Sequence, residues 1–198
     1  MTGMRERKKA QNRAALLASG RKLFASKGVD ATSMESVAAD ADISTPSLYN
    51  YFGSKDELLA AIIVQDLEAE IADAGTVVAK PPKPARSAYL KLIRIYFTAF
   101  DSIDRAMLRR FTAHAIARED SAYIDYFGVD SQLLSQIEKM TIAMCDAGTL
   151  PQGTEPKRLA RAVFSIANSE YYAYIADDEI RSDRVVKIIA DQIDLLLS

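Results

Sequence analysis

Apolar residues along the chain recur every three or four positions, which is the spacing of one face of an α-helix. Near the N-terminus Leu16, Leu17, Leu23 and Phe24 follow this period, and the spacing continues to the last residues. No segment has the strict apolar–polar alternation of a half-buried β-strand. We therefore predict an all-α fold with about nine helices. The expected helices cover about residues 5–27, 33–40, 45–51, 54–73, 85–100, 104–117, 121–147, 156–176 and 182–197.

Short polar motifs mark where the first helices begin. Thr32 precedes Glu35 by three residues, and Ser54 precedes Glu57 by three, which is the spacing of a capping box. In this motif the hydroxyl accepts a backbone N–H while the glutamate reaches back to the cap residue. We expect Thr32 and Ser54 to cap their helices, and Ser44 to cap the short helix between them.

Glycine, proline and aspartate residues indicate turns and breaks. Gly28 and Gly75 are expected to end the first and fourth helices. Asp42 tolerates the left-handed backbone of a tight turn, and Pro46 fits the first turn of a helix. The segment 80–84 contains three prolines and cannot be helical, so we expect it to be a linker.

The segment 44–52 divides its side chains sharply. Leu48 and Phe52 form its apolar face, whereas the other side carries only hydroxyl, amide and phenol groups. A helix of about two turns with small polar groups outside suits the major groove of DNA, which admits one α-helix. We therefore expect a three-helix N-terminal unit with a helix-turn-helix that binds double-stranded DNA.

The distribution of charge supports this expectation, although the net charge of −2 alone would argue against it. Residues 1–55 carry nine Lys and Arg against five Asp and Glu, whereas residues 56–198 carry sixteen against twenty-two. A basic small domain on an acidic larger one is expected when only one end meets phosphate. The alternative is chance segregation on an ordinary solvated surface. We predict a helix-turn-helix DNA-binding domain at 1–53 and a helical effector-binding and dimerisation domain at 54–198, a bundle whose first helix belongs to both.

Three stretches of the N-terminal region resemble the N-terminal domain of the TetR family of transcriptional regulators. They are FASKGVDATSM (24–34), VA (37–38) and ISTPSLYNYFGSKDEL (43–58). The resemblance covers about residues 10–60 without a gap and includes the Leu-Tyr-x-x-Phe core and the Ser-Lys-x-Glu-Leu helix start. The chain departs from the family pattern at Asp42, Pro46 and Tyr51, where Gly, Gly and His are common.

The resemblance implies roles for individual residues on DNA. Phosphate contacts position a protein on the duplex and base contacts specify the sequence. The backbone would be held by Thr32 or Ser33, Tyr49, Tyr51 and Lys55, and base edges would be faced by Thr45, Ser47 and Asn50. The full predicted set is Thr32, Ser33, Ser44, Thr45, Pro46, Ser47, Tyr49, Asn50, Tyr51 and Lys55. A basic arm at 5–13 is expected to reach an adjacent phosphate or the minor groove.

Two copies of so short a helix are needed to read an operator. Copies on a two-fold axis would read a pseudo-palindrome. The helices near 156–176 and 182–197 carry apolar residues around more than one face, and a helix that is apolar on two sides must bury both. We predict a homodimer through these helices, as in the family. A central helix buried inside a monomer is the alternative.

Aromatic residues and methionines recur with a few polar groups in the middle of the chain. A cavity lined by such side chains is a common small-molecule site between bundle helices, and the resemblance also implies an effector pocket there. We predict a lipophilic or aromatic effector. The candidate residues are Tyr96, Phe100, Met107, Phe111, His114, Tyr123, Met140, Met144, Asn168 and Tyr171. His114 is the candidate for an orienting polar contact, and an ordinary core or surface histidine is the alternative.

The sequence offers no support for catalysis. One His and one Cys, without an HxxxH, CxxC or HExxH pattern, a P-loop or a dinucleotide motif, predict no metal site, no cofactor and no enzyme. The acidic run 177–179 is interpreted as a solvated turn. The single Cys145 and the lack of an apolar run of ~18 residues predict a cytoplasmic protein without a membrane partner.

These observations together predict a ligand-responsive DNA-binding regulator, a repressor that is released when an effector binds in the bundle and moves the helix after Ser54. The rival hypothesis is a helical small-molecule-binding protein whose helix-turn-helix does not bind DNA. An all-α enzyme, in which His114 pairs with a nearby carboxylate, is a third.

Overall fold

The computed structural model describes residues 2–117 and 122–198, with side chains described outside positions 2, 70 and 122–131. This part of the chain forms ten α-helices and one 3₁₀ turn, and it contains no strand. The all-α prediction is confirmed, with ten α-helices rather than about nine. The elements are α1 (Thr2–Lys27), α2 (Met34–Asp40), α3 (Thr45–Tyr51), α4 (Lys55–Glu70), η1 (Ile71–Asp73), α5 (Ala74–Ala79), α6 (Ala85–Asp101), α7 (Arg105–Ala117), α8 (Ala122–Asp146), α9 (Pro156–Ala176) and α10 (Ser182–Leu197).

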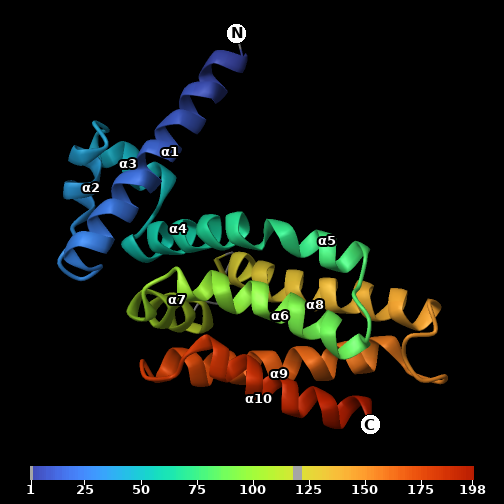
Figure 1. The fold of residues 1–198 in the computed structure, drawn as a ribbon. Coiled ribbons are helices and arrows are strands. Elements are labelled where there is room, and N and C mark those ends of the chain that lie inside the picture. Colours follow the sequence, from blue (N-terminus) through green and yellow to red (C-terminus); the bar gives the residue numbers. More distant parts are fainter. Residues whose placement is uncertain (1, 118–121) are drawn as a thin grey trace.

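Helices α1, α2 and α3 form the N-terminal unit. Figure 1 shows that the N-terminal half of α1 extends well beyond the other two helices. The C-terminal half of α1 is anchored by Leu16 and Leu17, which are buried together with Val37 of α2 and Leu48 of α3. The unit is therefore held by a small apolar core at one end of α1, and the basic end of α1 projects from it.

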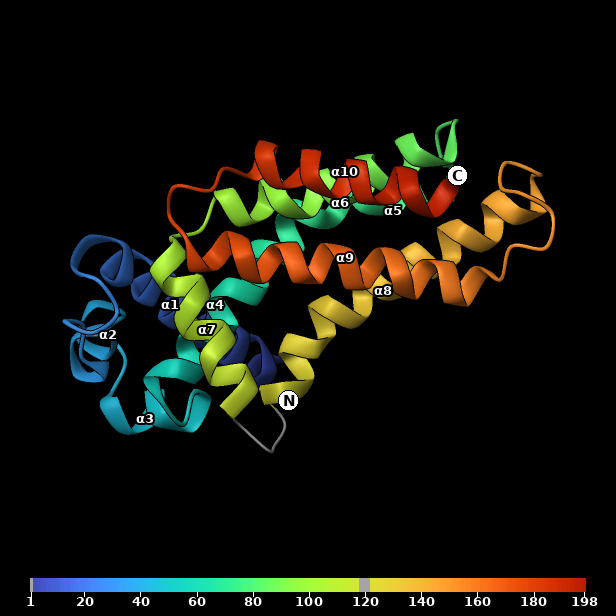
Figure 2. The ribbon, with the colours of Figure 1, turned by 90° about the horizontal axis from the view of Figure 1, so that it is seen from below.

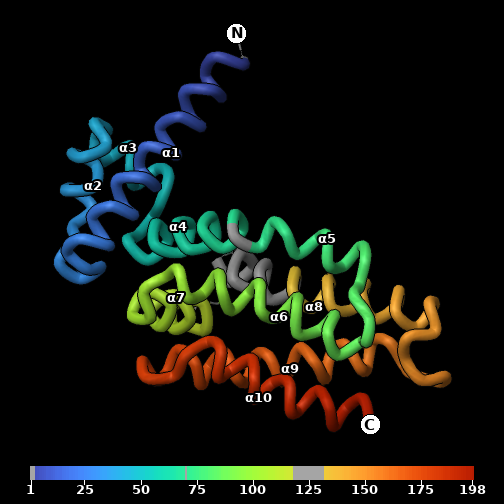
Figure 3. The backbone as a smooth tube through the Cα atoms, viewed as in Figure 1, coloured from blue at the N-terminus to red at the C-terminus, as the bar shows by residue number. Residues whose placement is uncertain are grey.

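The extra helix arises where the fourth helix was expected to end. The chain leaves α4 at Glu70, tightens into η1 and resumes as α5, in which Gly75 is helical. Figure 3 shows that α5 continues nearly along the direction of α4. The prediction that Gly75 breaks the helix is therefore wrong. Ile71, Ala74 and Val77 are buried at spacings of three, and this burial outweighs the weak helix propensity of one glycine.

The body is built from α6, α8, α9 and α10, which are covered on one side by α4 and α5 (Figure 1). Figure 2 shows α9 running through the middle of the body, where it contacts α8 and α10. The predicted linker 80–84 is not helical, and α6 begins directly after it.

Tyr89 and Thr141 share a fully buried hydrogen bond of 2.8 Å, and burial raises the pKa of Tyr89 to about 12. The phenol is therefore neutral, and the pair satisfies two polar groups inside the core.

The apolar core continues from the N-terminal unit through α4 into the body. Leu58, Leu59, Ile62 and Ile63 of α4 are fully buried, and α4 contacts α1 as well as α6, α7 and α8. The first helix after residue 53 thus packs on both parts of the molecule. Within the described ranges, no helix combines the length and the apolar character needed to span a membrane.

Gly20 allows α1 and α4 to approach each other closely. A Cβ atom at this position would lie 2.9 Å from Ile62 Cδ1 and 3.2 Å from Leu58 Cδ2. We expect Gly20→Val to lower the free energy of unfolding by about 1–3 kcal/mol, because the buried contact cannot accept a larger side chain. Urea denaturation measures this loss. The control is Gly75→Val, where an added Cβ meets nothing within 4 Å. Equal losses at the two positions would contradict the packing explanation.

Candidate nucleic-acid interface and ligand cavity

The turn between α2 and α3 has the geometry of a helix-turn-helix. Asp42 adopts the left-handed backbone that the turn requires, with φ of 54°, and Ile43 N–H donates to the carbonyl of Ala38 at 2.9 Å. Pro46 lies in the first turn of α3, as expected. Leu48 and Phe52 are buried, so α3 is fixed to the core by one face and presents the other outward.

The caps of these helices differ in part from the prediction. Ser54 caps α4 by accepting Glu57 N–H at 3.1 Å, as predicted, whereas the Glu57 carboxylate accepts Gly53 N–H at 2.8 Å, from the residue before the cap. The N-cap of α2 is Ser33, which accepts Ser36 N–H at 3.1 Å. Ser44 occupies the N-cap position of α3, but its hydroxyl pairs with another side chain and caps no backbone N–H.

Thr32 is not a helix cap, contrary to the prediction. Its side chain is buried, and its hydroxyl donates to the carbonyl of Gly28 at 2.8 Å, with the carbonyl of Leu23 at 3.3 Å. The end of α1 leaves carbonyls without helical partners, and the Thr32 hydroxyl satisfies them. The Thr32 side chain is therefore turned inward, whereas the neighbouring Ser33 is exposed.

The outward side of α3 carries most of the predicted DNA-facing groups. Tyr49 is 45% exposed, and Asn50 and Pro46 are exposed as well. Thr45, Ser47 and Tyr51 are partly buried, and the Ser44 and Ser47 hydroxyls lie 2.7 Å apart. Tyr49 and Asn50 are thus the groups of α3 that the fold presents most openly.

Tyr51 also lies beside the projecting arm of α1. A groove between them is lined by Arg5, Glu6, Lys8, Lys9, Asn12 and Tyr51. Arg13, one turn further along α1, has its guanidinium carbon 5.5 Å from the centre of the Phe52 ring. The basic arm is therefore a helix whose cations face the same surface as the end of α3. The spacing of positions 5, 8, 9 and 12 is the sequence signal for this shared helical face.

Lys55 has a structural task that sequence reasoning missed. Its ammonium donates to the carbonyls of Val29, Asp30 and Thr32 at 2.8, 3.2 and 2.9 Å. An ammonium group has three donors, and all three are engaged with the loop between α1 and α2. The predicted phosphate contact would have to compete with these bonds.

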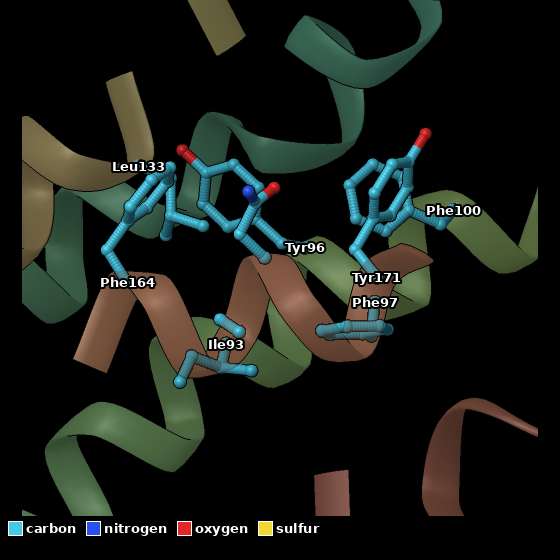
Figure 4. A pocket seen from close by; sticks show the side chains of 9 residues that line it. Ile93, Tyr96, Phe97, Phe100, Leu133, Phe164 and Tyr171 are labelled. Carbon is cyan, nitrogen blue, oxygen red and sulfur yellow. The ribbon is translucent and has the colours of Figure 1, made fainter. Parts of the chain in front are cut away.

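A second candidate site lies inside the body, between α6, α8 and α9. It is a small cavity of about 20 Å³, which is enough for one water molecule but not for an organic ligand. Its lining residues are Ile93, Tyr96, Phe97, Phe100, Leu133, Phe164, Ala167, Asn168 and Tyr171. Figure 4 shows the rings of Phe100 and Tyr171 at one end of this view and Phe164 with Leu133 at the other.

Four of the predicted ligand residues line this cavity: Tyr96, Phe100, Asn168 and Tyr171. Met140 and Met144 on α8 and Phe111 on α7 are buried in the core without lining it. Met107 lines an open crevice between α7 and the end of α1, and the half-buried His114 lines neither space. Tyr123 lies outside the residues whose side chains the structure describes.

Sequence reasoning missed Ile93, Phe97, Leu133, Phe164 and Ala167 as lining residues. A signal was available, because the lining positions of α6 and of α9 each span eight residues at spacings of three and four. The same period marks ordinary core residues, so it could not by itself single out the cavity.

The cavity is connected to α7 by a hydrogen bond. The hydroxyls of Tyr171 and Thr112 lie 2.9 Å apart, and this contact is buried. The Tyr171 ring packs against Phe100 with centroids 4.8 Å apart. A ligand larger than water must displace side chains of the lining, and a displacement of Tyr171 would disturb its contact with α7.

Helix α7 is in turn tied to the N-terminal unit. Arg110 donates to Asp56, in the first turn of α4, at 2.5 Å, and it also pairs with Asp30 in the loop after α1. The Asp56 hydrogen bond, opposed by partial desolvation, raises the pKa of Arg110 above its usual value, so the guanidinium stays charged. α7 therefore contacts both a residue that lines the cavity and the N-terminal unit.

Two further arginines fix α7 to the end of α9. Arg109 donates to Asp178 at 2.7 Å and to the carbonyl of Ile175 at 2.9 Å. Arg105 donates to the carbonyl of Ile180 at 2.7 Å, and its guanidinium lies 3.3 Å from the centre of the Tyr174 ring. The start of α7 is therefore joined firmly to the turn between α9 and α10.

The outer sides of α9 and α10 carry apolar residues in the open. Tyr172 on α9 and Ile188, Leu195 and Leu196 on α10 are among the exposed large hydrophobic residues, and Leu195 is 78% exposed. The opposite sides of both helices are buried in the body.

Among the described residues, no group of three or more His, Cys, Asp or Glu could hold a metal ion.

Comparison with known proteins bears on the N-terminal unit first. Residues 16–62 match the model of the bacterial regulatory proteins of the tetR family, and they contain the C-terminal part of α1, all of α2 and α3, and the first part of α4. Residues 16–62 are a TetR-family N-terminal domain. No curated protein is detectably similar to the chain in sequence.

Solved structures extend the likeness to the whole TetR-type fold. The TetR-family regulator PfmR from Thermus thermophilus is 20% identical, with a TM-score of 0.61, over 92% of this chain and 96% of its own. FadR from Thermus thermophilus, a TetR-family repressor solved with lauroyl-CoA, is 18% identical, with a TM-score of 0.69, over 93% of each chain. FadR from Bacillus subtilis, solved with stearoyl-CoA, is 13% identical, with a TM-score of 0.67, over 93% of this chain and 97% of its own. The chain therefore has the fold of a TetR-family transcriptional regulator.

The role of Lys55 within the TetR-family domain can be tested by its removal. We expect Lys55→Ala to lower the free energy of unfolding by about 1–3 kcal/mol, because three backbone carbonyls lose a charged donor. Urea denaturation measures the change. Lys91→Ala, at an exposed position of α6, is the matched control and should leave stability unaltered. A Lys55→Ala variant as stable as wild type would mean that the loop does not depend on this ammonium.

Proposed function

We propose that the protein is a ligand-responsive transcriptional repressor that binds a pseudo-palindromic operator as a homodimer and is released by a small lipophilic or aromatic effector. The observation that carries this proposal is the outward polar side of α3, with Tyr49 and Asn50 exposed on a helix that Leu48 and Phe52 anchor. Its position in a TetR-family domain supports the same conclusion.

DNA contact would involve two surfaces of residues 1–53. α3 would enter the major groove, with Tyr49 and Asn50 leading, and the cations of the α1 arm would meet phosphates beside it. The groove that joins Lys8, Lys9 and Tyr51 supports a continuous track from the arm to the end of α3. Residues 54–198 would bind the effector and form the dimer.

The dimer would form through α9 and α10. The open apolar residues there, Tyr172, Ile188, Leu195 and Leu196, support this surface, because a cluster of such residues is more stable when a second copy covers it. An isologous contact of this kind generates a two-fold axis, and the two copies of α3 are then related by the same axis.

The effector would bind at the cavity between α6, α8 and α9. Its aromatic lining supports a lipophilic or aromatic molecule, and the two FadR proteins were solved with acyl-CoA, in which a lipophilic acyl chain ends in a thioester carbonyl. A ligand changes the conformation only if it binds one state more tightly than the other. The closed cavity would belong to the DNA-binding state and the opened cavity to the released state.

Release would pass through α7. When a ligand displaces Tyr171, the hydrogen bond between Tyr171 and Thr112 would be lost, and α7 would then shift relative to α9. Arg110 would carry this shift to Asp56 on α4 and to Asp30, and thus to α3. The separation of the two α3 helices in the dimer would change, and they would no longer fit successive major grooves.

Tyr49→Ala tests the assignment of α3. We expect this variant to bind operator DNA at least tenfold more weakly, because an exposed phenol is lost from the contact surface, where a good contact contributes about 1–3 kcal/mol. Operator fragments are obtained by footprinting upstream of neighbouring genes, and affinity is measured by fluorescence anisotropy. Size-exclusion chromatography should give an unchanged dimer.

Salt dependence separates this function from that of a helical ligand-binding protein whose helix-turn-helix does not bind DNA. The logarithm of the wild-type binding constant should fall with the logarithm of salt concentration, with a slope of about −0.9 for each phosphate contacted. A binding constant that does not change with salt, or a Tyr49→Ala variant with wild-type affinity at moderate salt, would refute the assignment of α3 as the DNA-binding helix.

Arg110→Met tests the link between α7 and the N-terminal unit. Surface ion pairs contribute little stability, about 0–1 kcal/mol, so we expect the variant to stay folded. Spin labels at Asn50→Cys, in a Cys145→Ser background, report the distance between the two α3 helices of the dimer. We expect Arg110→Met to broaden this distance distribution, and Arg94→Met, at an exposed position of α6, to leave it unaltered. Equal widths in both variants would rule out the Arg110 link.

A further inference from the structure

The lining of the cavity restricts the chemistry of its ligand. The nine residues around it are five aromatic rings, three aliphatic side chains and one amide, that of Asn168. Not one of them carries a charge. The stretch of α8 whose side chains lie outside the description, 122–131, contains two aspartates and no Lys or Arg in its sequence. Neither the nine lining residues nor the stretch 122–131 therefore contains a Lys or Arg that could pair with an acidic ligand.

The polar groups of the lining differ in whether they already have partners. The Tyr96 hydroxyl donates to Gln136 Oε1 at 3.0 Å, and the Tyr171 hydroxyl pairs with Thr112 at 2.9 Å. Across the described ranges, no group is hydrogen-bonded to the side-chain amide of Asn168. An amide offers two N–H donors and one carbonyl acceptor, so Asn168 is the lining group with the most unused hydrogen-bonding capacity.

We infer that the cavity takes an uncharged, largely apolar molecule with one carbonyl-type group that accepts a hydrogen bond from Asn168, and that it rejects the corresponding carboxylate. This inference rests on the proposed effector role of the cavity, since the space of about 20 Å³ must widen to admit such a molecule. A ligand carbonyl replaces its lost water with the Asn168 N–H. A carboxylate would lose its hydration and gain one amide and no cation, which leaves a buried charge uncompensated.

Three probes with one ring system separate these contributions. They are 2-ethylnaphthalene, 2-acetylnaphthalene and 2-naphthoate, which differ only in whether the substituent is a hydrocarbon, a ketone or a carboxylate. Their binding to the full-length protein, without DNA, is measured by displacement of the neutral dye Nile red. We expect 2-naphthoate to bind at least about tenfold more weakly than the ketone, because its charge stays unpaired.

Substitutions of Asn168 identify the group responsible. We expect Asn168→Leu to weaken the ketone by roughly three- to tenfold, the effect of one hydrogen bond, and to leave the hydrocarbon within about twofold. Gln152→Leu removes an exposed amide in the loop before α9 and should alter neither affinity.

The outcomes that overturn the inference are distinct from those that overturn the proposed function. Equal losses for ketone and hydrocarbon in Asn168→Leu, tight binding of 2-naphthoate, or failure of all three probes would each exclude the inferred ligand chemistry. Operator binding is measured without a probe. A protein with the expected probe pattern that fails to bind DNA would refute the repressor function and leave the ligand chemistry standing.

Discussion

The buried fourth helix is the constraint on which both parts of the molecule depend. Leu58, Leu59, Ile62 and Ile63 have no exposed surface, and their helix packs on α1 as well as on the body. Each of these side chains contributes roughly 1.5–3 kcal/mol by its burial, so neither contact can be given up cheaply. Gly20 brings the two helix axes close together on the α1 side. A displacement of α4 must therefore move the N-terminal unit as a body, which is the property a regulated DNA-binding domain requires.

The polar contacts around α7 fix the position of this helix more than they stabilise the fold. Ion pairs at this level of exposure add little to the free energy of folding, yet Arg110 joins α7 to the N-terminal unit while Arg105 and Arg109 join it to the end of α9. Tyr171 adds a contact from the cavity through Thr112. A cavity with room for little more than a water molecule is thus lined by Tyr171, which a short series of contacts connects to the N-terminal unit. The proposed regulation needs no other connection.

Most of the predicted motifs that act within one helical turn are present, and the exception is Ser44, whose hydroxyl pairs with that of Ser47 instead of capping α3. The Ser54 cap, the left-handed Asp42 and the early position of Pro46 depend on neighbouring backbone only, and all three are present. Thr32 and Lys55 have roles that differ from those predicted, because carbonyls at the end of α1 and in the loop after it accept their donors. Backbone carbonyls without helical partners require hydrogen-bond donors, and the side chains that supply these donors are turned inward. The polar side chains that face outward are those that do not supply them.

The sequence by itself determined the helices, the basic N-terminal unit and the apolar face that anchors α3. Periodicity, caps and local charge depend only on residues that are close together in the sequence. Tertiary structure decided the rest. Gly75 stays helical because burial of the flanking α5 residues outweighs its propensity. Asn168 lines a cavity while Met140, at an equally apolar helical face, lies in the close-packed core. Which face meets a void depends on how three helices approach one another in space, and no spacing along one helix contains that information.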